Sequence, residues 1–318
     1  MINQPAEQMR CMEVWGGNQL SARSVQFGGL DTWVYSQPYG EAHAGGDVYY
    51  ASSCATGRIS RFLLADGAGH GRMVAATAAD LRTLMRRFVN RLDQTEFVRL
   101  LNQHFAVLPR SGAFATAIVA TFFEPSRRLS VSNAGHPRPL LYRAASQNWD
   151  FLGAPLAAPR STPSNVPLGL FDAAEYHQFD TELQAGDCLL SYTDALIESR
   201  DADGEMLGEE GLLRITRLLS DVEPREFIKA LVAEIQERFP ENLSEDDVTV
   251  MLMRANGKPV TFRPKESLRA LGRFTLALLG SASPSGERAP FPDANLANIG
   301  GAIIPGLGRR WRVAEKRV

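Results

Sequence analysis

The sequence contains few cysteines, no long apolar run and no leader-like beginning. Its three cysteines, Cys11, Cys54 and Cys188, lie far apart, which fits neither a disulfide framework nor a paired-cysteine metal site. No stretch approaches the ~18 uninterrupted apolar residues that a membrane span needs, and the first residues are not charged and then apolar. These absences predict a soluble protein of the reducing cytoplasm. Cys54 and Cys188 lie in apolar strand-like segments and are therefore expected to be core residues.

The chain also has almost no excess of charge. Its 318 residues include 34 Lys plus Arg and 36 Asp plus Glu, which gives a formal net charge of −2. This balance does not indicate the positive field of a protein that binds nucleic acid or a membrane surface. The length allows a core without disulfide or metal staples, in one large domain with appendages or in two modest ones.

Strand-like segments dominate the first two-thirds of the chain. They are short and rich in β-branched, aromatic and aliphatic residues, and turn residues such as Ala55–Gly57 and Glu124–Ser126 join neighbours at hairpin-like distances. Neighbouring strands are therefore expected to be antiparallel. The predicted strands are Thr32–Ser36, Asp47–Cys54, Arg58–Ala65, Ala113–Phe123, Arg128–Ser132, Pro139–Arg143, Tyr176–Leu183, Asp187–Tyr192 and Val248–Met253.

Helical segments interrupt and follow these strands. After Gly71, apolar residues recur on one helical stripe as far as Phe88. A second helix is predicted to begin at Asp93, which can cap the backbone, with Glu96 in the reciprocal capping-box position. Two further helices are expected over Glu209–Leu219 and Pro224–Phe239. Strands with segregated helices predict a layered α+β sandwich.

Two stretches do not follow this pattern. Leu152–Pro167 is dense in Pro, Ala and Ser without periodicity, which predicts a long surface loop. Beyond Arg254 the sequence changes to an apolar stretch, a linker and a Gly-rich tail with a basic end. We therefore expect an N-terminal extension over residues 1–29, one folded domain over residues 30–255, and a C-terminal extension over residues 256–318.

Acidic residues mark the ends of four predicted strands. Asp47 starts one strand and Asp66 ends the next, both beside glycines, while Asp194 follows a third and Asp246-Asp247 precedes a fourth. Carboxylates at strand ends escape burial, and neighbouring glycines can expose carbonyls as additional oxygen donors. Each residue alone is most simply a turn or helix cap. As a set, they match the oxygen-only ligation of Mg²⁺ or Mn²⁺ by carboxylates from separate segments.

Five motifs occur in a characteristic order between about Leu30 and Arg254. They are Gly45-Gly46-Asp47, Asp66-Gly67-Ala68-Gly69-His70-Gly71, Asn133-Ala134-Gly135-His136-Pro137, Tyr192-Thr193-Asp194 and Asp246-Asp247-Val248-Thr249. Any single motif is a weak signal. Together, in this register, they resemble the type 2C metal-dependent protein phosphatases, specifically their bacterial SpoIIE-like branch.

The resemblance implies a four-layer sandwich, with two central antiparallel β-sheets flanked by helices and a dinuclear Mn²⁺ or Mg²⁺ site at one edge. It implies that Asp66 bridges both cations and that the Gly67 carbonyl adds a ligand to one of them. The remaining roles that it implies are Asp194 and Asp246 as ligands of the other cation, Asp47 acting mainly through metal-bound water, and Asp247, Asn133 and His136 in support.

The implied reaction is hydrolysis of phosphoserine and phosphothreonine by a metal-activated water. Two cations can lower the pKa of a shared water and clamp the phosphoryl oxygens, so no phosphoenzyme is needed, and the chain has no Cys-x5-Arg phosphatase loop. Eukaryotic relatives have a histidine two residues after the bridging aspartate, where this chain has Ala68. His70 is then a candidate general acid, or it orients the start of the helix; His43 is an outside candidate.

Two further departures from the eukaryotic pattern concern phosphate binding and a turn. Around Tyr35–Gly40 the chain offers no arginine where those enzymes bind phosphate, so phosphate binding would rest on the metals. Ala195 follows Asp194 where a glycine is usual. Because alanine adds only a methyl group, we expect activity to survive this change.

The resemblance also implies a signalling role. SpoIIE-like phosphatases commonly act on a phosphorylated anti-anti-sigma-like protein in bacterial partner switching, and a regulatory partner could bind the C-terminal extension. Two other functions remain open: a catalytically weak phosphatase-like module that binds a partner, and a two-metal hydrolase of phosphodiesters or nucleotides. The complete set of acids favours a working enzyme over the first, and the near-neutral charge argues weakly against nucleic acid as a substrate.

Overall fold

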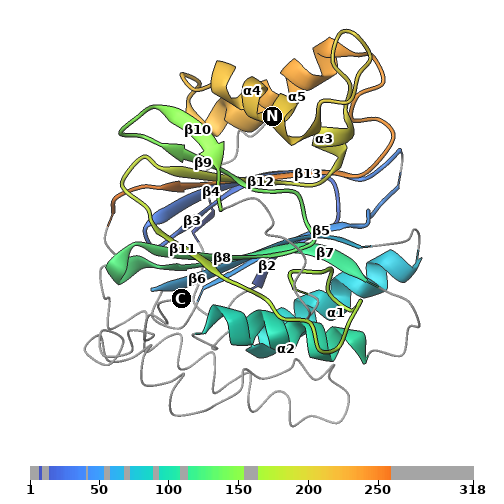
Figure 1. The fold of residues 1–318 in the computed structure, drawn as a ribbon, viewed down its shortest axis with the longest axis vertical. Helices are drawn as coiled ribbons and strands as arrows, with labels where there is room; N and C mark the ends of the chain where they lie inside the picture. The colour runs from blue at the N-terminus through green and yellow to red at the C-terminus, as the bar shows by residue number, and fades with distance from the viewer. Residues whose placement is uncertain are drawn as a thin grey trace.

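Two β-sheets lie face to face between two layers of helices in the computed structural model of the chain (Figure 1). The structure describes residues 7–8, 14–40, 42–53, 58–67, 72–88, 93–107, 114–153 and 164–258. The prediction of a four-layer α+β sandwich is confirmed. Among the helices of the described residues, none combines the length and the apolarity that a membrane crossing requires.

Sheet A joins segments from the beginning, middle and end of the described chain. Its strand order is β1-β3-β4-β13-β12-β9-β10, and every pair is antiparallel except β1 with β3. The long pairing of β4 with β13 places Tyr35 opposite Val250. The strands are β1 Glu7–Gln8, β3 Ser21–Phe27, β4 Leu30–Gln37, β9 Leu140–Arg143, β10 Asn148–Phe151, β12 Cys188–Tyr192 and β13 Val248–Ala255.

Sheet B is antiparallel throughout, with the order β11-β8-β7-β6-β5-β2. Its strands are β2 Val14–Gly17, β5 Asp47–Ser53, β6 Ile59–Gly67, β7 Ala115–Phe123, β8 Arg128–Ala134 and β11 Phe179–Glu182. A short 3-10 helix, η1 (Glu124–Ser126), turns β7 into β8 as the hairpin spacing predicted. β5 is buried at every position, because one of its faces meets sheet A and the other meets helices.

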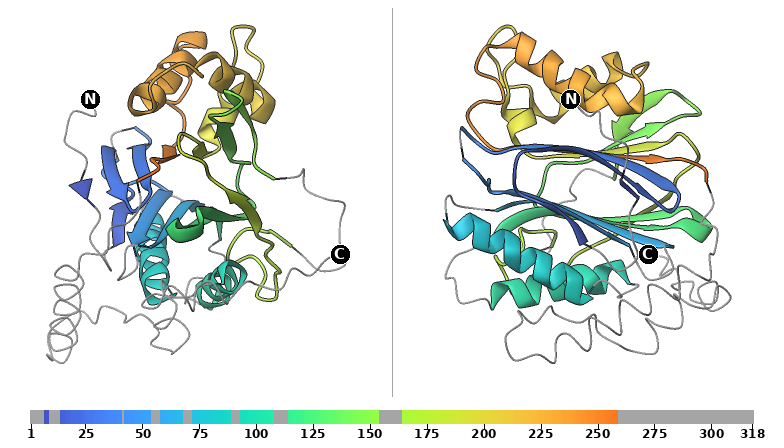
Figure 2. Two further views of the ribbon diagram at one scale, coloured as in Figure 1. Left: turned by 90° about the vertical axis from the view of Figure 1, so that its left-hand side faces the viewer. Right: turned by 180° about the vertical axis from the view of Figure 1, so that it is seen from behind.

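The helices cover the two outer faces of the sandwich (Figure 2). α1 (Arg72–Phe88) and α2 (Gln94–Ala106) cover sheet B, while α3 (Ala195–Glu198), α4 (Gly208–Leu218) and α5 (Pro224–Arg238) cover sheet A. Asp93 caps α2 as predicted, since its carboxylate accepts a hydrogen bond from the Glu96 amide at 2.8 Å. Three apolar clusters fill the layers: one between the sheets and one beneath each helical layer.

The predicted domain boundary at residue 30 is wrong. β2 pairs with β5 and β3 pairs with β4, so residues expected in an N-terminal extension belong to both sheets. β3 has the sequence SARSVQF, in which polar residues on the outer face weaken the strand signal. The prediction also missed β10 and α3, which are four residues each and too short to show a period.

Other predictions are changed in detail or fall outside the described residues. The strand expected over Tyr176–Leu183 is only Phe179–Glu182, and Tyr176 instead packs in the cluster beneath α1 and α2. Cys188 is a free, buried thiol, as expected. The predictions that lie outside the described residues concern Cys54, Ala68, His70, most of the loop over residues 152–167, and the tail beyond Lys258.

Candidate active site

The acids predicted from the sequence gather at one edge of the sandwich. β5 begins at Asp47 and β6 ends at Asp66-Gly67, and the ladder places Asp47 directly opposite Asp66. In sheet A, Asp194 follows β12, and Asp246 precedes the antiparallel neighbour β13. β13 starts, and α3 lies, at the right-hand end of sheet A in Figure 1. Within each sheet the two strand ends meet because neighbouring antiparallel strands alternate in direction, and a hydrogen bond from Thr193 to Asp47 joins the two sheets at this edge.

A threonine between the two sheets locks this edge. The Thr193 hydroxyl donates to Asp47 Oδ2 at 2.8 Å and accepts a hydrogen bond from the Thr249 amide at 3.0 Å. The Thr193 amide in turn donates to the Thr249 carbonyl at 3.0 Å. Thr193 is fully buried and Asp47 is 3% exposed. Sequence reasoning quoted Thr193 within a motif and missed this role, because the contact joins residues 146 positions apart.

Asp247 holds the loop that leads into β5. Its Oδ1 accepts a hydrogen bond from the Tyr39 amide at 2.6 Å, and its Oδ2 accepts one from the Gly46 amide. A Cβ atom at Gly45 would lie 2.5 Å from Asp247 Oδ1, so this contact requires glycine. Since both carboxylate oxygens already bind backbone amides, Asp247 positions the loop of Gly45 and Gly46 beside the acids.

Gly46 leaves open the space in front of the next two residues of the site. A Cβ atom at Gly46 would lie 3.2 Å from the Gly67 carbonyl oxygen and 3.7 Å from Asp66 Oδ1. The Gly67 amide donates to the Gly46 carbonyl at 3.2 Å, which fixes the two strands at this spacing. Any side chain at position 46 would therefore cover two oxygen donors that glycine leaves accessible.

The carboxylates influence one another strongly. Burial, and then the nearby charges of Asp194 and Asp246, raise the pKa of Asp66 to about 7. Burial and the charge of Asp66 raise the pKa of Asp47 well above its usual range, although hydrogen bonds from Thr193 and Thr249 partly oppose this. Burial and the charge of Asp246 also raise the pKa of Asp194. Asp66 therefore interacts with the acids of both sheets.

This arrangement suits a hard divalent cation in its chemistry. Among the described residues, no three acidic, histidine or cysteine side chains are arranged to hold a metal ion as they stand. The donor set nevertheless consists of oxygens alone, a side chain at Gly46 would cover the Gly67 carbonyl, and Asp66, Asp194 and Asp246 each raise the pKa of another of the acids. A bound cation would relieve that repulsion, so the residues fit such a group.

His136, in the Asn133–Pro137 turn, is held by hydrogen bonds through its backbone and its ring. Asn133 Oδ1 accepts a hydrogen bond from the His136 amide at 2.8 Å, and Asn133 Nδ2 donates to the His136 carbonyl at 2.7 Å. His136 Nδ1 lies 2.8 Å from the Thr116 hydroxyl, and burial lowers the pKa of His136 to about 3. A neutral imidazole at neutral pH holds the rim together and is not a proton donor of the imidazolium type. His43 is exposed.

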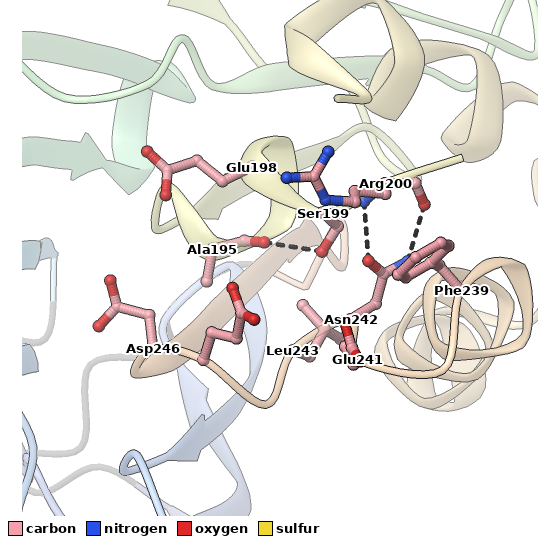
Figure 3. A pocket seen from close by; sticks show the side chains of 10 residues that line it. Ala195, Glu198, Ser199, Arg200, Phe239, Glu241, Asn242, Leu243 and Asp246 are labelled. Carbon is pink, nitrogen blue, oxygen red and sulfur yellow. Dashed lines mark hydrogen bonds between the residues drawn. The ribbon is translucent and has the colours of Figure 1, made fainter. Parts of the chain in front are cut away.

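Sequence reasoning missed Glu198, which lies close to the acids of sheet A. Glu198 ends α3, and burial together with the charges of Asp194 and Asp246 raises its pKa. It lines a small hollow beside Asp246, shown in Figure 3. Ala195 begins α3 as a buried helical residue, a position that an alanine methyl group fits well.

The comparisons with known proteins agree with this geometry. The sequence model of the family described as Stage II sporulation protein E (SpoIIE) matches residues 57–256. No curated protein sequence matches the chain.

Solved structures share the fold. The RsbU and RsbW domains of a Mycobacterium tuberculosis protein have 25% identity and a TM-score of 0.59, with coverage of 80% of this chain and 71% of that one. The PP2C phosphatase domain of Bacillus subtilis SpoIIE has 16% identity and a TM-score of 0.59, covering 76% and 71%. RsbX in complex with magnesium has 16% identity and a TM-score of 0.53, covering 74% and 99%. The family model, which matches more than half of the chain, shows that the chain belongs to the SpoIIE family and carries a metal-dependent serine/threonine phosphatase domain of the PP2C type, and the solved structures share its fold.

Proposed function

We propose that the chain hydrolyses phosphoserine and phosphothreonine in a protein substrate with two divalent cations, Mn²⁺ or Mg²⁺, at the edge shared by the two sheets. The observation that supports this best is the position of Asp66. It is paired with Asp47 in sheet B and is coupled electrostatically to Asp194 and Asp246 of sheet A. A residue so placed can join two half-sites into one.

The ligand roles follow from these positions. We assign Asp66 to both cations, the Gly67 carbonyl and Asp47 to the sheet B side, and Asp194 and Asp246 to the sheet A side. When bound, such cations lower the pKa of water and neutralise the charge of the phosphoryl oxygens. Asp47 is positioned for its role by the Thr193 hydroxyl, which holds one of its two oxygens.

Other residues keep the acids in place or bear on which group donates a proton to the leaving alkoxide. Asp247 holds the Gly46 amide and so keeps Gly46 next to the Gly67 carbonyl. His136 is neutral and buried, and therefore supports the rim. His70 lies four positions after Asp66 and remains our candidate for protonating the leaving alkoxide.

The substrate that we propose is a phosphorylated anti-anti-sigma-like protein in a bacterial cytoplasmic partner-switching pathway. The similarity to a chain that carries RsbU and RsbW domains supports this choice, as does membership of the SpoIIE family. The near-neutral net charge favours a protein over nucleic acid.

Hydrolysis of a phosphoserine peptide tests the proposal. The wild-type chain should release phosphate with Mn²⁺ and stop when a chelator is added, and Asp66→Ala should show no turnover. A phosphodiester and a cyclic dinucleotide, assayed in parallel, test the two-metal hydrolase alternative. Preference for either, or undiminished peptide hydrolysis by Asp66→Ala, would contradict the proposal. A wild-type chain inactive on all three substrates would favour the partner-binding module.

A further inference from the structure

Two exposed apolar side chains, Leu20 and Tyr39, lie beside the acids at the edge of the sandwich. Leu20 is 74% exposed and Tyr39 is 57% exposed. Both lie at the open end of the β3–β4 hairpin, where Ser21 pairs with Ser36: Leu20 comes directly before Ser21, and Tyr39 comes three residues after Ser36. A single exposed apolar residue is common on a protein surface, but two of them on neighbouring turns at a catalytic edge indicate a contact surface.

Hydrogen bonds fix the backbone of both turns next to the acids. The Tyr39 amide donates to Asp247 Oδ1 at 2.6 Å. The Gly45 amide donates to the Asn18 carbonyl at 2.8 Å, and Asn18 Nδ2 donates to the Gly45 carbonyl at 3.1 Å. Gly45 precedes Gly46, whose amide is held by the same Asp247 carboxylate. Both turns are therefore tied to the loop that borders the acids, and neither uses its apolar side chain in these contacts.

The two sides of this edge differ in charge. The turn residues 18–20 and 37–40 have the sequences NQL and QPYG, without a charged side chain. The strand order β3-β4-β13-β12 places these turns on one side of Asp246 and α3 on the other, where Glu198 and Glu245 are exposed. A protein segment that crosses the edge therefore meets an apolar side at the two turns and an acidic side near α3.

Apolar contact is the kind of binding that the two turns offer to a protein substrate. With its phosphoryl group at the acids, a substrate must place the residues that flank the phosphoserine on the surface around them. A few apolar and aromatic side chains, tyrosine among them, dominate the binding energy of protein interfaces. A tyrosine ring supplies a large contact area and loses little conformational freedom on binding.

We infer that Leu20 and Tyr39 are specificity-determining residues, which bind an apolar side chain next to the phosphoserine of the protein substrate. This inference rests on the proposed function, because it names a feature of the substrate of that same site. The two side chains act in substrate binding and take no part in the chemical step.

Hydrolysis of three phosphoserine peptides by the full-length chain with Mn²⁺ tests the inference. The peptides share one sequence, except that the residues on both sides of the phosphoserine are leucine, glycine or lysine. The wild type should hydrolyse the leucine peptide with a kcat/KM about tenfold above that of the glycine peptide, mainly through KM, since a large apolar side chain is buried. In the double variant Leu20→Ser/Tyr39→Ser this ratio should fall close to one.

Two control variants should keep the wild-type ratio. Tyr39→Phe retains the aromatic ring and removes only the hydroxyl group. Leu218→Ser removes a leucine that is 72% exposed at the end of α4, next to Arg217, which contacts β10 at the other edge of sheet A. Each ratio compares peptides with one enzyme preparation, so a smaller folded fraction of a variant does not change it.

Several results would overturn the inference while phosphate release by the wild type still supports the proposed function. They are equal kcat/KM of the wild type for the leucine and glycine peptides, a wild-type ratio in the double variant, and a lost ratio in either control. A preference for the lysine peptide would also overturn it, because the acids near α3 would then select the substrate. If the wild type hydrolyses none of the peptides, the proposed function fails, and the inference fails with it.

Discussion

Sheet B and sheet A bring acids to the same edge in different ways. In sheet B, Asp47 and Asp66 lie on paired strands, and the hydrogen-bonded ladder sets their separation. In sheet A, Asp194 and Asp246 lie just outside their strands: the Asp194 carbonyl accepts backbone hydrogen bonds from α3, and Asp246 Oδ1 accepts one from the Asp247 amide. Asp47 is buried, Asp194 is partly buried and Asp246 is exposed.

This difference predicts which half of the site lowers the free energy of unfolding of the metal-free protein. On the sheet B side, the carboxylates of buried Asp47 and half-buried Asp66 face each other on a rigid frame, so the metal-free protein should become more stable when one is neutralised. On the sheet A side, the acids are more hydrated and depend on neutral polar contacts. Loss of those contacts should therefore destabilise the fold. Substitutions in the two halves are expected to change stability in opposite directions.

The largest effect is expected from Asp66→Asn. Hydrolysis of a phosphoserine peptide should fall by about a thousandfold or more, since the interaction lost is worth several kcal/mol at the transition state. The metal-free variant should nevertheless be at least as stable as the wild type. The pKa of Asp66 is raised in the folded state to about 7. Protonated Asp66 therefore contributes to the free energy of unfolding at low pH, and this contribution is lost as the pH rises through that value.

The advantage of Asp66→Asn over the wild type should therefore grow between about pH 4 and pH 7 and then stay constant. Chemical denaturation of both metal-free proteins at a series of pH values measures this. Asp31→Asn is a suitable control, since Asp31 lies in β4 outside the group of acids. A metal-free Asp66→Asn that is less stable than the wild type at pH 8 would remove the proposed contrast between the halves.

The next effect is expected at the rim, where His136 contacts Thr116. His136→Ala should lower the free energy of unfolding by about 2–4 kcal/mol, because it opens a cavity and removes the partner of a hydroxyl group. The depressed pKa of His136 means that wild-type stability from this group is present above about pH 6.5 and is lost as the pH falls towards 3. Denaturation of His136→Gln should show a weaker acid dependence.

Kinetics distinguish the rim role of His136 from catalysis. The pH profile of kcat should have the same limbs in His136→Gln as in the wild type. Disappearance of the alkaline limb in this variant would show that His136 donates a proton, and the rim interpretation would be wrong.

A smaller effect is expected from Asn242→Ala, which removes three hydrogen bonds near α3. We expect a loss of about 2–3 kcal/mol of stability, since buried backbone groups of Arg200 and Ile235 lose partners. Mn²⁺ affinity should fall as well, because α3 begins directly after Asp194. Asn133→Ala is the matched control: Asn133 holds the His136 backbone in the same manner, so it should reduce stability without weakening Mn²⁺ binding.

The smallest effect is expected from Asp247→Asn. An amide oxygen can still accept a hydrogen bond from Tyr39 or Gly46, so the free energy of unfolding should change by less than about 1 kcal/mol. Asp247→Ala should cost about 2 kcal/mol, because two amides lose their partner. Denaturation curves measure both. If Asp247→Asn weakens Mn²⁺ binding as much as Asp246→Asn does, Asp247 is a ligand and not a supporting residue.

The sequence predicted the acids at the strand ends well, because both the strands and their ends have local signals. Asp47 and Asp66 adjoin glycines and long apolar strands, and the hairpin spacing predicted that β5 and β6 pair antiparallel, as they do. β3 was missed because the polar residues on its outer face weaken its strand signal. It forms as a strand by pairing with β4, which its own sequence does not show.

The contacts that organise the site could not be predicted in this way. The hydrogen bond from Thr193 to Asp47 and the binding of Tyr39 by Asp247 each join residues more than 100 positions apart. They depend on which strands become neighbours, and a single sequence contains no local pattern for that. Glu198 was missed for a related reason. α3 is one turn long, too short to show a period, and Asp246, which lines the same hollow as Glu198, belongs to a separate segment of the chain.

The number of Mn²⁺ ions bound by the metal-free chain tests most directly whether the two sheets form one site. The wild type should bind two ions, Asp194→Asn should bind one, and Asp66→Asn should lose high-affinity binding of both. Two ions bound to Asp66→Asn with wild-type affinity would contradict the assignment of Asp66 as the residue that joins the two halves.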